Sequence, residues 1–328
     1  MRAVIVREHG SFRSPRVETV PDPVPGRGEV VIDARAIGVN YPDLLVIEGR
    51  YQLLPPRPFS PGKEVAGVVS AVGPGATRFR PGERVMAQRE YGAYAEKTLA
   101  PEATCYRLPD ALGFEQGAAL GLAYQTSHFA LVERAACRKD ETVLVTGASG
   151  GVGLAGVEIA KALGARVIAG VTSVEKGELA ARHGADHVIN LAAPDLRNSL
   201  REQVYAAVGK RGVDIVLENV GGEVFDGALR ALGWRGRMVV VGFASMRLPQ
   251  INANYLLLKN ISAVGLQWSD YREREPEWVQ RVQAELYAFW AEGKLQPYVS
   301  ECFPLARFAD ALAGFVERKV RGKMVLIP

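Results

Sequence analysis

The stretch from residue 141 to residue 176 constrains the fold most, because it places a short apolar run, a glycine cluster, a helical pattern and a second apolar run in order. Residues Thr142–Val145 are β-branched or apolar and too few for a helix, so they predict a parallel strand buried on both faces. A second strand is predicted at Arg166–Ala169. This order is that of a βαβ unit, and it predicts an α/β fold with a doubly wound parallel sheet.

The glycine cluster after the first strand has the chemistry of a phosphate-binding turn. Glycines let backbone N–H groups approach a pyrophosphate, and the positive end of a helix starting near Val152 favours the anion. Ala148 replaces the first glycine of the usual fingerprint, but the spacing A-S-G-G-V-G is kept. The alternative is a purely structural glycine turn. The residues predicted to bind the cofactor here are Ala148, Ser149, Gly150, Gly151, Val152 and Gly153.

The end of the second predicted strand indicates which nucleotide binds. A site for NAD usually has an acidic residue there, about 20 residues after the glycines, to bind the ribose hydroxyls. This sequence has Thr172 and Ser173 instead, with Lys176 one helical turn later. These side chains can donate hydrogen bonds and positive charge to a 2′-phosphate, so the sequence predicts NADPH. The alternative is an ordinary helix N-cap by Ser173 beside a solvated lysine.

Composition excludes several other classes of function. The chain has 328 residues, with 40 basic and 36 acidic side chains spread along it, so nucleic-acid binding is not indicated. No apolar run approaches the roughly 18 residues that cross a bilayer, and the start has no signal pattern, so we expect a cytoplasmic protein. Cys105, Cys137 and Cys302 lie far apart and form no CxxC pair, and the histidines show no metal-site pattern.

Residues 1–122 read as a β-rich unit. Short β-prone runs at 4–6, 30–36, 65–72 and 84–87 are separated by segments rich in proline and glycine. Such a pattern predicts a small barrel-like domain in front of the nucleotide unit.

Four motifs together resemble the medium-chain dehydrogenase/reductase superfamily: IGVNYPDLLVIEGRY, PGKEVAGVVSAVGPGATRFRPGERV, AYQTSHFAL and TGASGGVG. Within it they resemble the zinc-free quinone oxidoreductase, or zeta-crystallin-like, branch. The resemblance covers essentially the whole chain. It implies a discontinuous GroES-like β-barrel catalytic domain at 1–122 and 269–328, closed by the strand RGKMVLIP, and a Rossmann NADPH-binding domain at 123–268. It also implies a homodimer or a dimer of dimers.

The same resemblance implies chemistry without a metal. Zinc-dependent relatives have a cysteine where this sequence has Asn40 and a histidine where it has Lys63, and neither replacement is a usual zinc ligand. The four-cysteine structural zinc lobe of those relatives is also missing. We therefore expect no metal site.

Two acceptor-site residues follow from the resemblance, Asn40 and Tyr51. Asn40 offers amide donors to a substrate oxygen, and Tyr51 offers an aromatic face and a hydroxyl; the alternative is that both only hold loops. Asp43 is expected to cap a helix starting near Leu44. Lys63 and Glu64 are expected to pair structurally and are given no catalytic role.

Further elements complete the Rossmann domain. Residues 123–131 predict a helix that crosses between domains, on which Thr126 matches a family position facing the nicotinamide, although its hydroxyl can instead bond to its own helix. Strands are expected at 187–190, 213–222, 237–243 and 261–268, and ligands collect at the carboxyl ends of such strands. The resemblance places cofactor contacts there at Asn219, Gly242 and Phe243. The charged stretch 269–278 is expected to be a solvated loop, followed by an amphipathic helix that packs through its apolar stripe.

The expected activity is an NADPH-dependent oxidoreductase that passes hydride to a quinone in the cleft between domains, with positioning and water exclusion as the protein's contribution. Two alternatives stay open. One is reduction of the C=C bond of an enone or enoyl thioester, which uses the same cofactor geometry. The other is a crystallin-like or sensor protein that binds NADPH without turnover.

Overall fold

The computed structural model describes residues 1–328, which form two compact units. The first comprises residues 1–122, 269–287 and 297–328, and the second comprises residues 123–268 and 288–296. The sequence-based boundaries differ from this division in one segment, because they assigned residues 288–296 to the first unit. Each unit is described separately below.

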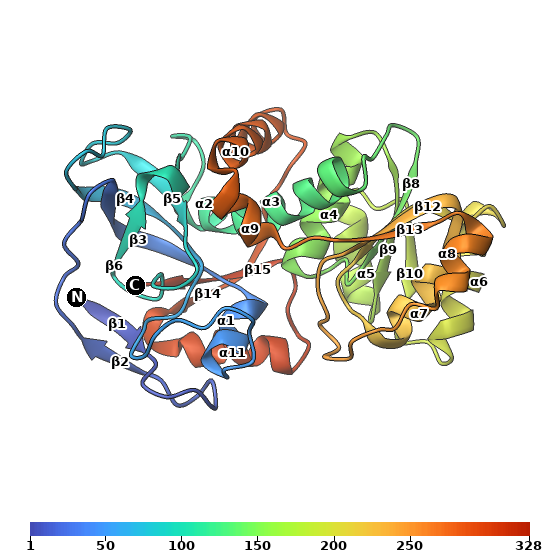
Figure 1. Ribbon diagram of the computed structural model, residues 1–328, viewed down its shortest axis with the longest axis horizontal. Coiled ribbons are helices and arrows are strands. Elements are labelled where there is room, and N and C mark those ends of the chain that lie inside the picture. Colours follow the sequence, from blue (N-terminus) through green and yellow to red (C-terminus); the bar gives the residue numbers. More distant parts are fainter. The chain divides into compact units, whose positions relative to one another are not determined.

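The second unit is built on a six-stranded parallel sheet in the order β10-β9-β8-β11-β12-β13 (Figure 1). This order, with the first strand in the middle, is that of the Rossmann fold, and it confirms the predicted doubly wound sheet. The strands are β8 (Thr142–Thr146), β9 (Arg166–Val171), β10 (His187–Asn190), β11 (Val213–Glu218), β12 (Leu232–Val240) and β13 (Ser262–Gly265). The helices are α3 (Leu122–His128), which continues as a π-helix over Phe129–Arg134, α4 (Gly151–Ala162), α5 (Val174–Arg182), α6 (Leu196–Val208), α7 (Gly222–Ala231) and α8 (Ala253–Lys259).

The central strands of this sheet are buried along almost their whole length, as their apolar runs predict. All five residues of β8 are buried, and helix α4 packs on this part of the sheet through its small residues. A Cβ atom at Gly156 would lie 2.4 Å from Cδ2 of Leu217 on β11, so only a residue without a side chain lets the helix approach this closely.

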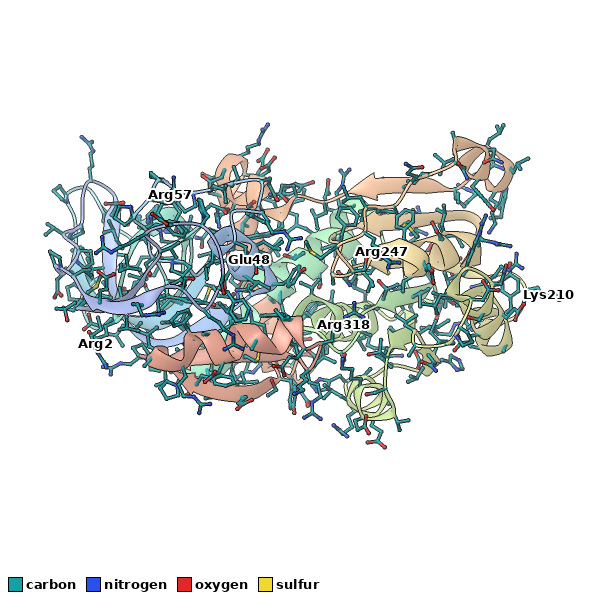
Figure 2. All side chains as sticks on the ribbon, turned by 90° about the horizontal axis from the view of Figure 1, so that it is seen from below. Arg2, Glu48, Arg57, Lys210, Arg247 and Arg318 are labelled. Atoms are coloured by element: carbon teal, nitrogen blue, oxygen red, sulfur yellow. The ribbon has the colours of Figure 1, made fainter.

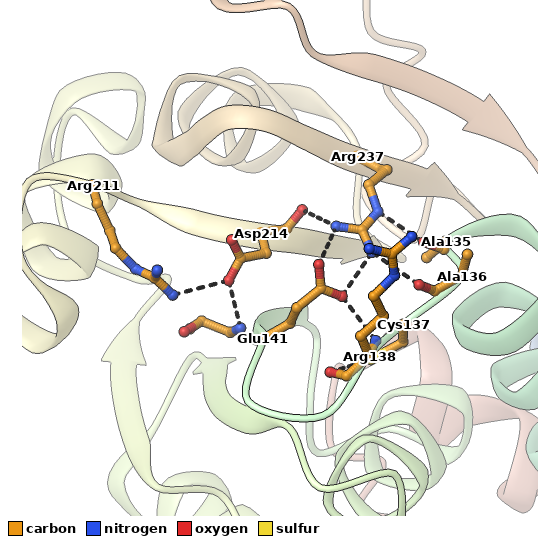
Figure 3. A network of polar contacts seen from close by, with 9 residues as sticks. Ala135, Ala136, Cys137, Arg138, Glu141, Arg211, Asp214 and Arg237 are labelled. Atoms are coloured by element: carbon orange, nitrogen blue, oxygen red, sulfur yellow. Dashed lines mark hydrogen bonds and ion pairs between the residues drawn. The ribbon is translucent and has the colours of Figure 1, made fainter.

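The amino ends of the central strands are joined by an ion-pair network (Figure 3). Arg237 of β12 binds both carboxylate oxygens of Glu141, at 2.8 and 2.7 Å, and also donates to the carbonyl oxygen of Ala135. Asp214 of β11 accepts from the backbone N–H of Thr142 at 2.8 Å. A bidentate pair of this kind fixes geometry as well as adding energy. Together these bonds tie β8, β11 and β12 to one another at the amino ends of the strands.

The first unit is a seven-stranded, mainly antiparallel sheet in the order β14-β15-β3-β4-β5-β7, with β6 on β3, and a separate β1-β2 pair. Its strands are β1 (Arg2–Ile5), β2 (Arg16–Thr19), β3 (Glu29–Val39), β4 (Glu64–Val72), β5 (Arg84–Gln88), β6 (Lys97–Pro101), β7 (Cys105–Arg107), β14 (Val299–Pro304) and β15 (Lys323–Ile327). Its helices are α1 (Tyr41–Ile47), α2 (Phe114–Leu120), α9 (Trp268–Arg274), α10 (Pro276–Ala291) up to Tyr287, and α11 (Phe308–Val316). The expected closing strand is β15, which pairs antiparallel with β3.

The charged stretch 269–278 was expected to be a solvated loop, and this prediction is wrong. It forms most of α9 and the start of α10. The side chain of Arg272 is only 2% exposed and is paired with Glu90, while the rings of Tyr271 and Trp278 meet edge to face at 5.7 Å. The prediction failed because the many charges of this stretch suggested full exposure, whereas one of them, Arg272, is buried and paired with the distant Glu90.

Lys63 and Glu64 do not pair with each other, contrary to expectation. Successive residues of an extended chain point to opposite sides, so the two side chains meet different partners. Lys63 binds Glu90, whereas Glu64, which is fully buried, binds Lys323 of β15 at 2.5 Å. The second oxygen of Glu64 accepts from the backbone N–H of Leu122 at 2.7 Å. This buried pair joins the last strand of the chain to the sheet of the first unit.

We predict that Lys323→Met destabilises the protein by about 3–5 kcal/mol, because it leaves the Glu64 carboxylate buried without its counter-charge. Urea unfolding measures the loss. The double variant Lys323→Met/Glu64→Gln should recover most of it. Lys97→Met removes a partly exposed lysine that is paired with Asp22, and it should have little effect. Equal losses in Lys323→Met and Lys97→Met would contradict the prediction.

Candidate cofactor and acceptor sites

The turn after β8 has the backbone geometry that a phosphate-binding turn requires. Gly147 adopts a φ of 63°, in the left-handed region that favours glycine. The backbone N–H of Ala148 donates to the carbonyl of Gly170 at the end of β9. Helix α4 begins at Gly151, one residue earlier than expected, and its N-cap, Gly150, has no side chain to cap the first turn. The first N–H groups of a long helix are therefore left for another acceptor.

The glycines of this turn have two different roles. A Cβ at Gly153 would lie 2.1 Å from the carbonyl oxygen of Gly147, so this glycine is required by the close packing of α4 on the turn. A Cβ at Gly150 would meet nothing nearer than 3.5 Å, and one at Gly242 nothing nearer than 3.8 Å. These last two glycines border space that a side chain would fill. The turn therefore fits a dinucleotide, with backbone on one side and room on the other.

A buried carboxylate supports the next strand end, and sequence reasoning missed it. Glu218 closes β11 and accepts from the backbone N–H groups of Val220 and Gly221, at 2.8 and 2.5 Å. Its second oxygen accepts from the hydroxyl of Thr146 at 2.9 Å. Burial raises the pKa of Glu218 to about 7, although these hydrogen bonds oppose the shift. The signal was an acid at the end of an apolar strand, three residues before the first glycine of the following turn.

The predicted residues Asn219, Gly242 and Phe243 come together beside this carboxylate. The Asn219 side chain donates to the carbonyl of Thr146 at 2.9 Å, and the Asn219 backbone carbonyl accepts from the N–H of Ala244. The Cδ1 atom of Phe243 is 3.2 Å from where a Cβ at Gly221 would lie. The carboxyl ends of β8, β11 and β12 thus form one continuous edge, as expected of a Rossmann site.

The three residues predicted to distinguish NADPH from NADH lie within one helical turn. Ser173 is the N-cap of α5, and its hydroxyl accepts from the backbone N–H of Lys176 at 3.4 Å. The ammonium group of Lys176 donates to the hydroxyl of Thr172, also at 3.4 Å. Ser173 therefore caps the start of α5, as the alternative interpretation of this segment expected. The same geometry gathers two hydroxyls and one cation at the end of β9, with Glu175 in the first turn of α5 beside them.

Thr126 lies on α3 and is buried. Its neighbour Ser127 donates to the carbonyl of Val152 at 2.7 Å. This bond fixes α3 against the first turn of α4, so Thr126 is carried by a helix attached directly to the helix that follows the glycine turn.

In the first unit, Asn40 is buried, and its side-chain amide forms hydrogen bonds with other groups of the protein. Its nitrogen donates to Glu64 at 2.9 Å and to the Gly38 carbonyl at 3.3 Å, and its oxygen accepts from Lys323 at 2.7 Å. Asn40 is also the N-cap of α1, which begins at Tyr41 rather than near Leu44.

Asp43 is not the N-cap, contrary to expectation, but it supports the same helix start. It is the third residue of α1, and its carboxylate accepts from the backbone N–H of Asn40 at 2.9 Å. Tyr94 donates to the same oxygen at 3.0 Å. Burial raises the pKa of Asp43 to about 6, against the opposing effect of Lys63.

Tyr51 is half-buried in the segment that follows α1, and the ammonium group of Lys63 lies 4.6 Å from the centroid of its ring. Leu53 and Leu54, two and three residues further on, are exposed. The half-buried ring thus packs against the core of the first unit and faces a buried cation.

No cluster of three or more His, Cys, Asp or Glu side chains is placed to hold a metal ion. The three cysteines are separate and form no disulfide.

None of the helices is both long enough and apolar enough to cross a membrane. Side chains ending in nitrogen and side chains ending in oxygen are mixed along the ribbon in Figure 2.

A cavity of about 410 Å³ lies in the second unit beside the start of α7. It is lined by Arg197, Arg230 and Arg247 together with Glu223 and Asp226, so the charges nearly cancel. None of the predicted cofactor residues lines this cavity.

Comparison with known proteins finds matches to both units of the chain. Residues 26–110 match the family model of the alcohol dehydrogenase GroES-like domain, and residues 151–284 match that of the zinc-binding dehydrogenases. The chain is 38% identical to quinone oxidoreductase-like protein 2 of Bos taurus, over 94% of this chain and 87% of that protein. A mycobacterial protein solved with NADPH superposes with a TM-score of 0.94 at 33% identity, and Escherichia coli quinone oxidoreductase solved with NADPH superposes with 0.93 at 30%; both alignments cover 100% of each chain.

A Rossmann sheet with a glycine turn, combined in one chain with a GroES-like β unit, defines the class of medium-chain dehydrogenases and reductases. Within that class, this chain belongs to the quinone oxidoreductase-like family.

We predict opposite outcomes for two alanine substitutions in the turn. Gly153→Ala should destabilise the protein by about 1–3 kcal/mol, because its Cβ meets backbone that cannot move independently. Gly150→Ala should leave stability nearly unchanged but weaken NADPH binding, because its Cβ enters the space left for the nucleotide. Thermal unfolding and nucleotide titration of both variants provide the test. A stable Gly153→Ala variant, or full NADPH affinity in Gly150→Ala, would count against the assignment.

Proposed function

We propose that this protein is a zinc-independent, NADPH-dependent oxidoreductase that reduces quinones by hydride transfer. The observation that carries the proposal is the carboxyl edge of the Rossmann sheet, where an uncapped helix start, two glycines bordering free space and a hydroxyl-lysine group lie together. The NADPH found in two related structures is consistent with it.

The cofactor-binding residues in this proposal have three tasks. The turn at 148–153 binds the pyrophosphate through backbone N–H groups, and Thr172, Ser173 and Lys176 bind the 2′-phosphate. Thr126 faces the nicotinamide end, and Asn219, Gly242 and Phe243 contact the adenosine and nicotinamide parts of the cofactor at the strand ends. When bound, NADPH supplies a hydride. The protein positions it and excludes water.

Asn40 and Tyr51 are the proposed acceptor-side residues. A hydrogen bond from Asn40 to a substrate oxygen replaces its bond to Gly38, which at 3.3 Å is the longer of its two donor bonds. Tyr51 provides a ring face for a planar acceptor. Reduction of a quinone to a hydroquinone takes up one hydride and one proton, so a proton follows from solvent or from the Tyr51 hydroxyl.

The proposal also covers the absence of zinc, the oligomeric state and the cellular location. Asn40 and Lys63 stand where zinc-dependent relatives have ligands, and Lys63 is itself a cation, which disfavours a metal ion beside it. Strand β13 lies at the edge of the Rossmann sheet, which supports pairing of two copies as a homodimer. We propose the cytoplasm as the site of action.

Two other functions compete with this one. An enone or enoyl-thioester reductase uses the same cofactor geometry, and a crystallin-like or sensor protein binds NADPH without turnover. Purified protein should be assayed for NADPH oxidation with a panel of quinones and a panel of enones and enoyl thioesters. Faster turnover of quinones supports the proposal. Preference for the conjugated panel favours the first alternative, and tight NADPH binding without turnover of either favours the second.

The cofactor preference gives a sharp prediction. Lys176→Ala should weaken NADPH binding about tenfold, because it removes a charge-assisted contact worth roughly 1.5 kcal/mol at a partly exposed position. NADH binding should hardly change, since NADH has no 2′-phosphate. Titration of wild type and variant with both nucleotides measures the difference, and Lys161→Ala, which removes a partly exposed lysine paired with Asp186, is the control. Equal losses for both nucleotides, or a wild type that prefers NADH, would contradict it.

A further inference from the structure

The ammonium group of Lys63 is buried, with only 3% of the residue exposed. It has partners on more than one side. It donates to the carboxylate of Glu90 at 2.5 Å and to the backbone carbonyl of the same residue at 3.1 Å. On another side it faces the ring of Tyr51, 4.6 Å from the centroid. A buried ammonium requires such partners, because its desolvation is otherwise costly.

Glu90 is itself held from a distant part of the chain. Arg272 of α9, almost fully buried, donates to its other carboxylate oxygen and also pairs with the exposed Glu273. Burial raises the pKa of Glu90, but the charges of Lys63 and Arg272 outweigh burial and lower it, so the carboxylate stays charged. Four segments of the first unit thus meet in one chain of contacts that runs from Arg272 through Glu90 and Lys63 to Tyr51.

We propose that Lys63 is a positioning residue that fixes the Tyr51 ring for the acceptor, and that Glu90 fixes Lys63 in turn. A cation over an aromatic face is attracted by the ring, and the attraction is stronger where the cation is desolvated. The Tyr51 ring packs against the core of the first unit on one side. The ammonium group of Lys63 adds an attraction that depends on the orientation of the ring, so the core and the cation together fix its plane. This inference rests on the proposed function, in which Tyr51 lies beside the acceptor.

The alternative is that Lys63 only stabilises the first unit, and a cycle of variants separates the two. Lys63→Met removes the charge and keeps most of the length of the side chain. It is combined with Tyr51→Phe, which keeps the ring, and with Tyr51→Leu, which removes it. Lys63→Arg keeps a cation that stacks on rings, and Lys97→Met is the matched control for loss of a partly exposed, paired lysine in the same unit. Each protein is assayed for kcat/KM with the best quinone, for NADPH affinity and for urea unfolding.

In the wild-type background, Lys63→Met should lower kcat/KM for the quinone roughly three- to thirtyfold. NADPH affinity should not change, and Lys63→Arg should restore part of the activity. The effect should persist in the Tyr51→Phe background, because a phenylalanine ring still binds the cation, and should disappear in the Tyr51→Leu background. Glu90→Gln should lower kcat/KM in the wild type but add little to Lys63→Met.

Equal effects of Lys63→Met in the wild-type and Tyr51→Leu backgrounds would overturn the inference, even if unfolding shows a loss of stability. So would a loss of NADPH affinity as large as the loss of kcat/KM. If no acceptor supports NADPH oxidation by the wild type, the proposed function fails first, and the positioning role fails with it. An active wild type without coupling between positions 51 and 63 overturns the positioning role alone.

Discussion

The carbonyl oxygen of Gly147 lies where a side chain at position 153 would have to be, and this close approach determines the geometry of the candidate cofactor site. Because Gly153 lacks a Cβ, α4 can start directly against the end of β8. Gly156, one turn later, allows the same helix to pack on Leu217 of β11. The helix start, with its uncapped N–H groups, is thereby held at the carboxyl edge of the sheet, where an anionic group is favoured.

Each unit has a buried carboxylate that receives several hydrogen bonds beside the proposed site residues. In the second unit, Glu218 receives three donors and fixes the turn after β11. In the first unit, Glu64 binds Lys323, Asn40 and the backbone of Leu122. A buried carboxylate is costly unless its oxygens are hydrogen-bonded or paired with a cation, so removing one partner has a large effect while the intact network holds its neighbours in one geometry.

Local patterns in the sequence predicted the elements that depend on local chemistry. The β8 run and the glycine turn follow from residues adjacent in sequence, and the structure has the strand and the helix start there. Thr172, Ser173 and Lys176 also lie close together at the end of β9, where their role toward a 2′-phosphate stays a prediction. What could not be predicted are pairings between distant segments. Arg272 stands in a charged stretch that was predicted to be solvated, and only folding brings Glu90 to it. Lys323 lies in the predicted closing strand, and only folding places Glu64 beside it. Long-range charge pairs leave no periodic signal, which is why Lys63 and Glu64 were paired with each other and Glu218 was overlooked.

Hydrogen–deuterium exchange with and without NADPH tests the central claim, that the nucleotide binds at the carboxyl edge of the Rossmann sheet. The account predicts that NADPH slows exchange in the backbone of residues 148–153 and 172–176, and that NADH protects the first segment with a smaller effect on the second. Protection elsewhere in the second unit, with both segments unchanged, would contradict it.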